Sequence, residues 1–170
     1  MRYCVQPATA KDVALLALAM GDEDAGDTEY DRAGDQKPLD HLLNAFLCST
    51  EVWAAHDPQG QPCALWGVGP TSQGFEVGRF WLLTCEEVET QPRDLVALSI
   101  IVLPEMLASY SRLESIVDAQ NLRALALLQG LGFTAEPACF HEPAGRRCHR
   151  VWIEADAAIL GLKPRPALLN

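Results

Sequence analysis

The amino-acid sequence predicts an α+β protein whose central mixed, mostly antiparallel sheet is flanked by helices in an α/β/α-like arrangement. Two observations support this fold class. Consecutive β-like segments between residues 51 and 83 are linked by short, turn-rich stretches, which is typical of an antiparallel meander. Helix-like segments rich in leucine and alanine lie on both sides of this meander in the sequence, and the last of them ends at Leu131-Gly132-Phe133.

Length and composition are those of an ordinary globular protein. The 170 residues suffice for one compact domain, and 49% apolar with 21% charged residues indicates neither disorder nor a fibre. The net charge of −10 argues against a general nucleic-acid-binding protein, which needs a basic surface. No apolar run has the length of a membrane span, and the first residues lack the apolar core of a signal peptide. We therefore expect a protein of a cytosol, without membrane contact.

The first 50 residues predict one strand and two helices. The strand is expected at 2–6, and a largely buried helix at 11–20 has Thr9 as its N-cap and Asp12 in its first turn. Pro38 begins the second helix, at 38–49. Between the helices, residues 21–35 contain seven of the 23 carboxylates. Their spacing fits no calcium-binding loop, so they predict a solvated, mobile loop.

The remaining residues alternate between strands and helices. Strands are expected at 51–55, 63–69, 75–83, 113–117 and 150–154, with a turn at 141–147. A helix that begins at Pro92 is expected to end or kink near Pro104, and a leucine helix is expected at 121–131. We predict one domain over residues 1–155 and an extended C-terminal tail over 156–170, which cannot build a core of its own.

The cysteines and tryptophans favour packing over chemistry. The six cysteines include no CxxC pair, so we expect no metal site and interpret most of them as small buried hydrophobic residues. All four tryptophans fall in predicted strands, where core packing is the expected role; any exposed tryptophan would be the first candidate for a binding hot spot.

The leucine helix begins at Asn121-Leu122-Arg123-Ala124 and ends at Leu131-Gly132-Phe133. Asn121 is a suitable N-cap, and Gly132 can adopt the left-handed conformation that closes a helix. Together with the order of elements, these residues resemble the GCN5-related N-acetyltransferase (GNAT) superfamily over most of residues 2–155. The resemblance implies the GNAT fold. For an active member it also implies acetyl-CoA as cofactor, with Asn121 and Arg93 as candidate cofactor-binding residues.

The loop expected to bind the cofactor departs from the family pattern. GNAT enzymes hold the pyrophosphate of acetyl-CoA with a glycine-rich loop whose backbone N–H groups approach the phosphates. The equivalent residues here, 82–94, contain no glycine. They contain Glu86, Glu87 and Glu89, which would repel a polyanion, while Pro92 lacks an N–H and Arg93 is the nearby cation.

The expected catalytic acid is also missing. Many members of the superfamily have a tyrosine five residues before the phenylalanine of the motif, positioned to protonate the departing thiolate, and that position is Leu128 here. Leucine cannot transfer a proton. Tyr110 is a weak candidate for the acid and Glu76 for a general base. The favoured interpretation of Glu76 is the exposed residue of an alternating strand.

A narrower pattern points to bacteriophages. The strand at 80–84, the loop without glycine, and Val117-Asp118-Ala119-Gln120-Asn121 before Leu131-Gly132-Phe133 resemble acetyltransferase-like proteins of short-tailed phages, some of them internal virion proteins. This resemblance implies a protein made in the cytoplasm of a bacterial host and then assembled into the virion.

Three functions stay open. The favoured one is a degenerate GNAT protein without a cofactor, a non-catalytic virion structural or assembly component that contacts other virion proteins and has self-association as a further option. The second is an N-acetyltransferase that uses acetyl-CoA with an atypical loop, supported by Asn121 and the order of elements. The third is an acidic inhibitor or regulator of a host protein, supported by the charge alone.

Overall fold

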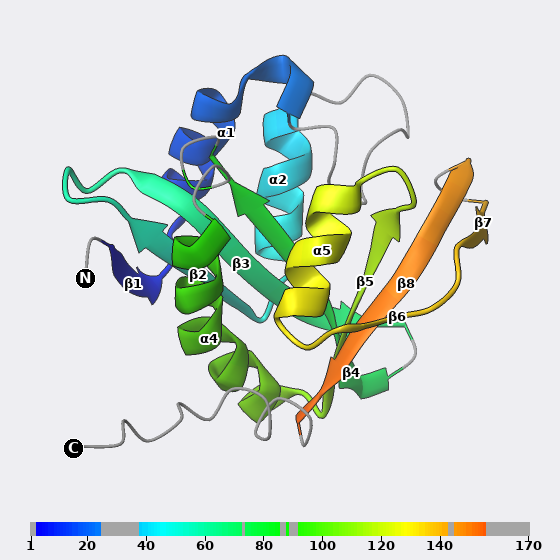
Figure 1. Cartoon of the computed structure of the whole chain (residues 1–170). Helices are drawn as coiled ribbons and strands as arrows, with labels where there is room; N and C mark the ends of the chain where they lie inside the picture. The colour runs from blue at the N-terminus through cyan, green and yellow to red at the C-terminus, as the bar shows by residue number, and fades with distance from the viewer. Residues whose placement is uncertain are drawn as a thin grey trace, which may run out of the picture.

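The computed structural model describes residues 3–24, 38–72, 74–85, 88, 92–142 and 145–155. The helices and strands in this part of the chain are, in order (Figure 1), β1 (Cys4–Pro7), α1 (Ala10–Asp24), α2 (Pro38–Leu47), β2 (Glu51–His56), β3 (Pro62–Thr71), β4 (Gly74–Thr84), α4 (Pro92–Ser109), β5 (Arg112–Asp118), α5 (Leu122–Gly130), β6 (Thr134–Ala135), β7 (Cys139–His141) and β8 (Arg146–Glu154). The predicted tail, 156–170, and most of the predicted acidic loop lie outside the described residues.

One eight-stranded sheet runs through the molecule in the order β1-β2-β3-β4-β5-β8-β6, with β7 paired to β8. Every described pair is antiparallel except β4 and β5, which are parallel. The meander β2–β3–β4 follows from its short turns: the carboxylate of Asp57 accepts the backbone N–H groups of Gln59 and Gln61 at 2.9 and 2.8 Å. The predicted mixed, mostly antiparallel sheet is confirmed.

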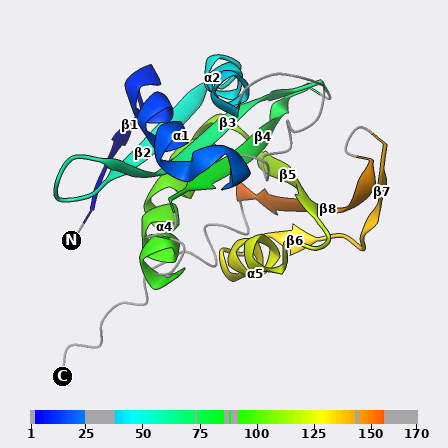
Figure 2. The ribbon, with the colours of Figure 1, turned by 90° about the horizontal axis from the view of Figure 1, so that it is seen from above.

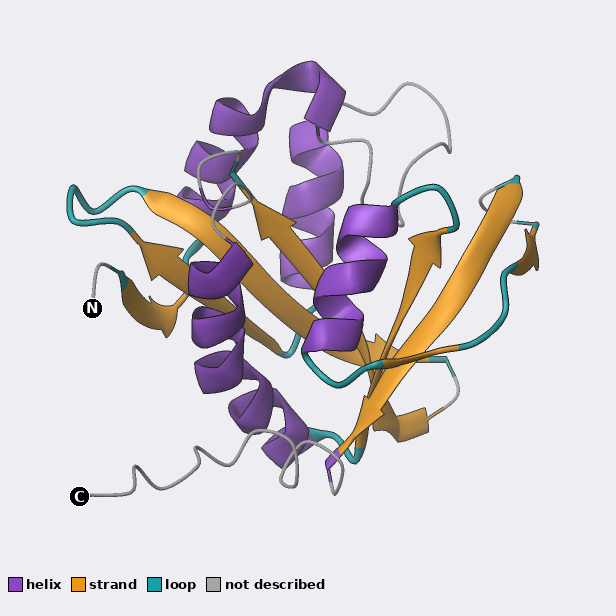
Figure 3. Cartoon of the chain, viewed as in Figure 1, coloured by secondary structure: helices purple, strands orange, loops and turns teal. Residues whose placement is uncertain are grey.

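Helices cover both faces of this sheet (Figures 2 and 3). The helices α1 and α2 lie over one face, and their buried residues form a cluster with those of the sheet: Val13, Leu16, Leu42, Ala54, Leu65 and Leu83. The helices α4 and α5 lie over the other face and bury a larger cluster that includes Trp66 and Phe80 from the sheet. Because each helix is apolar on the side that meets the sheet, both interfaces exclude water and supply most of the stabilisation.

The last helix, α5, has the ends that its sequence predicts. Oδ1 of Asn121 accepts the backbone N–H of Ala124 at 3.0 Å, which is the expected N-cap bond. Gly132 has a φ of 94°, in the left-handed region, and the N–H of Phe133 donates to the carbonyl of Leu128 at 2.9 Å. These contacts close the helix and direct Phe133 back into the core.

The first helix, α1, begins at a capping box that extends to the sheet. Asp12 Oδ2 accepts the backbone N–H of Thr9 at 2.7 Å, while Oγ1 of Thr9 accepts the N–H of Asp12 at 3.3 Å. The other carboxylate oxygen lies 3.0 Å from Nε2 of the buried His56, at the end of β2. Burial by itself raises the pKa of Asp12, but the hydrogen bonds with His56 and Thr9 outweigh it and hold that pKa below its usual value.

Replacing Asp12 by Asn is therefore expected to lower the free energy of unfolding by about 1–2 kcal/mol at neutral pH. A carboxyl group with a depressed folded-state pKa stabilises the protein fully above its unfolded-state pKa, near 4, and this contribution is lost as the pH falls through the folded-state value. The difference in unfolding free energy between wild type and Asp12→Asn, measured in urea, should shrink below about pH 4. Glu105→Gln, on the exposed side of α4, serves as control. A difference that persists unchanged to low pH would contradict this role.

Some predicted boundaries are wrong. Of the two alternatives predicted near Pro104, a helix end or a kink, the helix end is wrong, because α4 continues through Pro104 to Ser109. Pro104 is exposed, and the buried Met106 and Leu107 hold the next turn against the sheet. Residues 21–24 form the end of α1 instead of a loop. The last strand begins at Arg146, earlier than predicted, because it pairs with β7 from that residue on.

The cysteines are less buried than predicted, because most of them lie at strand edges or helix ends. Two cysteines are buried, Cys63 and Cys148, and Cys85 is half-buried. The other three are exposed: Cys4, Cys48 and Cys139. No group of three or more His, Cys, Asp or Glu side chains in the described residues could hold a metal ion. None of the described helices combines the length and apolar character that crossing a bilayer requires.

The tryptophans have the packing role that their positions predict. Trp66 is fully buried, and the other three are half-buried rather than exposed. The guanidinium of Arg112 lies 4.2 Å from the ring centroid of Trp152, a cation–π contact on the sheet. No tryptophan therefore marks an exposed binding surface.

Candidate functional site

The parallel strands β4 and β5 separate toward their carboxyl ends (Figure 1). They pair only where Val77, Gly78 and Arg79 lie beside residues 112–114. Beyond these positions β4 keeps its pairing with β3 and β5 keeps its pairing with β8, but the two strands form no ladder with each other. We call this opening the β4–β5 split. Along the split, β4 and β5 have backbone N–H and C=O groups that point toward the opening and not toward β3 or β8. These groups can form hydrogen bonds with an extended ligand.

Buried apolar side chains of both strands lie beyond the last paired residues of β4 and β5 and pack in the cluster that includes α5. Phe80 and Val117, one from each strand, are buried in the same cluster as Leu128 of α5. The rings of Phe80 and Phe133 lie 5.4 Å apart at an angle of 40°. A ligand that reached these four side chains would contact only apolar groups, because none of Phe80, Val117, Leu128 and Phe133 can be titrated.

The loop from β4 to α4 is described only in part. The backbone N–H of Cys85 donates to the carbonyl of Cys63 at 2.9 Å, and Val88 is buried in the core. The three glutamates predicted to repel a polyanion lie outside the described residues. Arg93 is exposed in the first turn of α4, so its guanidinium is accessible from solvent.

Asn121, the N-cap of α5, and Leu128, within α5, lie beside the split. The side-chain oxygen of Asn121 accepts the N–H of Ala124, so this side chain already has a structural role as the helix cap. Leu128 is 5% exposed and packs in the core under α5. The position of the family acid is therefore an ordinary core position in this chain, and it offers no proton to the split.

The two weak catalytic candidates lie at the closed end of the pair β4–β5. Tyr110 lies two residues before β5, is 6% exposed, and its hydroxyl lies 2.8 Å from Oγ1 of Thr50. Glu76 precedes the paired residues of β4, has an exposed side chain, and its carbonyl accepts the N–H of Ser111 at 3.0 Å. The structure therefore does not bring either group to the β4–β5 split, and Glu76 has the position of a surface strand residue.

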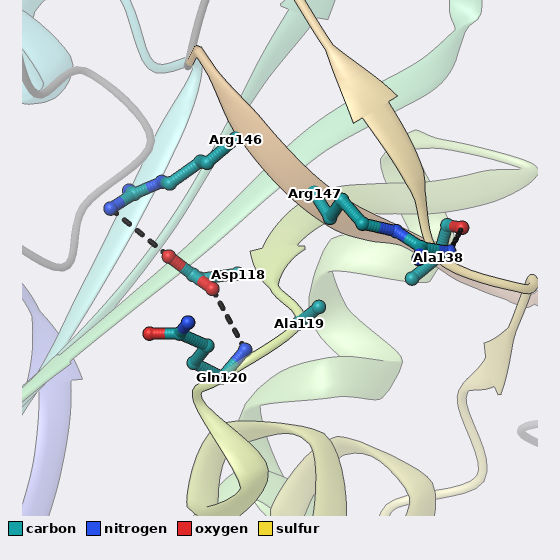
Figure 4. A pocket seen from close by; sticks show the side chains of 6 residues that line it. All are labelled: Asp118, Ala119, Gln120, Ala138, Arg146 and Arg147. Atoms are coloured by element: carbon teal, nitrogen blue, oxygen red, sulfur yellow. Dashed lines mark hydrogen bonds and ion pairs between the residues drawn. The ribbon is translucent and has the colours of Figure 1, made fainter.

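A surface cavity of about 680 Å³ lies at the carboxyl end of β5 (Figure 4). Its lining comes from the turn between β5 and α5, from the residue before β7 and from the start of β8: Asp118, Ala119, Gln120, Ala138, Arg146 and Arg147. Asp118 Oδ2 lies 3.1 Å from Nη1 of Arg146, and Oδ1 of the same carboxylate accepts the N–H of Gln120 at 2.8 Å. We call this concavity the β5-end cavity. The sequence analysis missed it, although the adjacent arginines in the predicted turn were an available signal.

The charges around β5 and β8 are mostly neutralised. Glu114 accepts hydrogen bonds from Nε and Nη2 of Arg150 at 3.1 and 2.8 Å, and these bonds raise the pKa of that guanidinium. The Nε of Arg112 lies 2.8 Å from the same carboxylate. Arg147 differs, because in the described part of the chain it bonds only the carbonyl of Ala138, at 2.7 Å, and no carboxylate.

A sheet with one parallel pair that opens into a split, and helices on both faces, is the architecture of GNAT-fold acetyltransferases. The chain has this fold. Three solved structures of such proteins share it: ribosomal-protein-S5-alanine acetyltransferase from Vibrio fischeri, spermidine N-acetyltransferase from Vibrio cholerae in complex with CoA and spermine, and a GNAT-family acetyltransferase from Streptococcus pneumoniae.

The match to these structures extends over nearly the whole chain. The TM-scores are 0.67, 0.62 and 0.60 in that order, with 13%, 14% and 15% sequence identity. The matches cover 92%, 93% and 89% of this chain and 94%, 98% and 99% of the other chains. No protein-family model and no curated protein matches the sequence. At these identities the likeness shows the fold alone.

Proposed function

We propose that the chain is a GNAT-fold protein that acts through contacts with other proteins and transfers no acetyl group. The observation that supports this most directly is the packing of Leu128. It occupies the position of the family acid, is 5% exposed and belongs to the core cluster under α5. A group that must protonate a departing thiolate needs a labile proton and access to the ligand, and this side chain has neither.

The loop before α4 supports the same conclusion. A phosphate-binding loop needs closely approaching backbone N–H groups, which glycines permit. Residues 82–94 contain no glycine and three glutamates, and the first residue of α4 is Pro92, which has no N–H to offer. The free energy of binding a pyrophosphate at this helix N-terminus is therefore expected to be small.

The setting we propose is the particle of a short-tailed bacteriophage. The support is the sequence resemblance of the strand at 80–84 and of the segment from Val117 to Asn121 to acetyltransferase-like virion proteins. In this setting the partners are other virion or assembly proteins, met first in the host cytoplasm. Mass spectrometry of particles purified from that host tests the setting, because absence of the chain from the particles would overturn it.

Titration of the purified chain with acetyl-CoA in a calorimeter tests the absence of acetyl transfer. We expect no heat of binding up to about 1 mM ligand, because the phosphate loop is missing, so any Kd lies above that concentration. Desulfo-CoA is a matched ligand that has the same phosphates and lacks the thiol. Saturable binding of acetyl-CoA at micromolar concentration would contradict the proposed function.

One observation favours a second candidate, an acetyl-CoA-dependent N-acetyltransferase. The β4–β5 split is retained, with its free ladder edges and with Asn121 at the start of α5. One structural neighbour was solved in complex with CoA. Acetyl-CoA binding in the calorimeter that the substitution Arg93→Gln weakens would favour this candidate, because Arg93 is the exposed cation at the start of α4.

A further inference from the structure

In the part of the chain that the structure describes, the β5-end cavity contains one arginine that no carboxylate neutralises, Arg147. Of the arginines in β5 and β8, Arg112, Arg146 and Arg150 each lie within ion-pair distance of a carboxylate. Arg147 is exposed, and among the described residues it donates one hydrogen bond, from Nη2 to the carbonyl of Ala138. A guanidinium has five N–H donors, so most of those of Arg147 stay available to an acceptor that enters from solvent.

An exposed aromatic side chain, that of Phe140, lies beside this cation. Phe140 lies directly opposite Arg147 in the ladder between β7 and β8, so both side chains are on the same face of the hairpin. Phe140 is 64% exposed. Aromatic side chains and arginine are the types enriched where proteins bind one another.

The walls of the β5-end cavity are held in place before any ligand arrives. The N–H of Ala119 donates to the carbonyl of Arg147 at 3.0 Å, which joins the turn after β5 to the start of β8. The carboxylate of Asp118 is engaged by both Arg146 and the N–H of Gln120 (Figure 4). The amino end of α5 begins just after this turn, and its partial positive charge adds to the attraction for an anion.

We propose that the β5-end cavity is a docking site for a segment of a partner protein that presents a carboxylate beside an apolar side chain. The carboxylate pairs with Arg147 in a charge-assisted, bidentate bond, and the apolar group packs against Phe140. A purely anionic ligand would leave the exposed ring unused, and a purely apolar one would leave the guanidinium unpaired. The β5-end cavity would then be the surface through which the chain makes the protein contacts proposed above. This inference rests on the proposed protein-binding function.

Small probes that separate charge from apolar area test the site. We would titrate the full ¹⁵N-labelled chain with N-acetyl-L-phenylalanine, with its uncharged amide and with acetate, and follow the backbone amides by NMR. N-acetyl-L-phenylalanine is expected to bind at least about tenfold more tightly than either of the other probes. The largest shifts are expected at the amides of Ala119, Gln120 and Arg147.

Each other outcome overturns the docking site. Equal binding of acetate indicates a simple anion site for free carboxylates, equal binding of the amide indicates an apolar patch, and no shift at these amides up to about 10 mM probe indicates no site.

Two pairs of variants provide the controls. Arg147→Gln and Phe140→Ser are expected to weaken binding of N-acetyl-L-phenylalanine at least about fivefold. Lys11→Gln and Leu47→Ser change an exposed cation and an exposed apolar residue on the helices of the other face, and they should leave the affinity unchanged. Equal losses in both pairs would overturn the site.

The experiments distinguish failure of the docking site from failure of the proposed function. Binding of acetyl-CoA in the calorimeter would contradict the non-catalytic function, while the NMR shifts that the probe causes at the β5-end cavity would stay as expected. An absence of probe binding together with an absence of acetyl-CoA binding would remove this site alone.

Discussion

Replacing Trp66 by Ala is expected to lower the free energy of unfolding by about 3–5 kcal/mol. Trp66 is fully buried in β3, and its Nε1 donates to Oγ of Ser99 on α4 at 3.0 Å. The substitution leaves a cavity between the sheet and α4 and removes a buried hydrogen bond. Since small domains have only about 5–15 kcal/mol in total, urea unfolding followed by far-ultraviolet circular dichroism should show a variant close to its stability limit.

Trp53→Ala is the matched control. Trp53 is half-buried in β2, and its Nε1 makes a long contact of 3.4 Å with the carboxylate of Glu51. The same change of side chain should therefore cost less than about 2 kcal/mol. Equal losses of unfolding free energy in Trp66→Ala and Trp53→Ala would show that the contact of Trp66 with α4 adds no further stabilisation.

Gly67→Ala is expected to cost about 2–3 kcal/mol although it adds a single methyl group. A Cβ at Gly67 would fall inside the indole of Trp81, at Cε2 and Cζ2. That ring cannot move freely, because its Nε1 donates to Oγ of Ser49 at 3.0 Å and the ring packs against the cluster under α1 and α2. Urea unfolding of the variant measures the loss.

The same substitution at Gly130 isolates the steric cause. Gly130 is the last residue of α5, and a Cβ there would meet nothing within 4 Å, so Gly130→Ala should be within about 0.5 kcal/mol of wild type or more stable. When Trp81 is replaced by Leu, the loss of unfolding free energy that Gly67→Ala causes should be smaller by at least about 1 kcal/mol. A penalty that is independent of Trp81 would contradict the clash.

The fold could be predicted wherever local residues determine local structure. The N-cap at Asn121, the left-handed Gly132 and the turn around Asp57 are all formed by bonds between residues a few positions apart. The prediction that the helix could end near Pro104 was wrong for the opposite reason. The local preference of Pro104 to end a helix is overridden by the burial of its neighbours Leu103 and Met106 against the sheet.

For the candidate site, the sequence predicts which residue types are absent. Leu128 stands where the family resemblance places a tyrosine, five residues before Phe133, and the structure shows that its side chain packs in the core. Tyr110 was a candidate because it is near the motif in sequence, yet its hydroxyl lies beside Thr50 at the closed end of β4 and β5. Sequence separation within a domain does not measure the distance between side chains on different strands.

The sequence alone determined the scaffold and the absence of a tyrosine and of a glycine loop, because those depend on residue type and on short spacings. Only the tertiary structure decided that Arg146 is paired with Asp118 while Arg147 contacts no carboxylate among the residues that the structure describes. The two arginines are adjacent, and successive residues of a strand face opposite sides of the sheet. The pairing of β8 with β5 places the carboxylate of Asp118 near Arg146. The pairing of β8 with β7 places the exposed Phe140 beside Arg147.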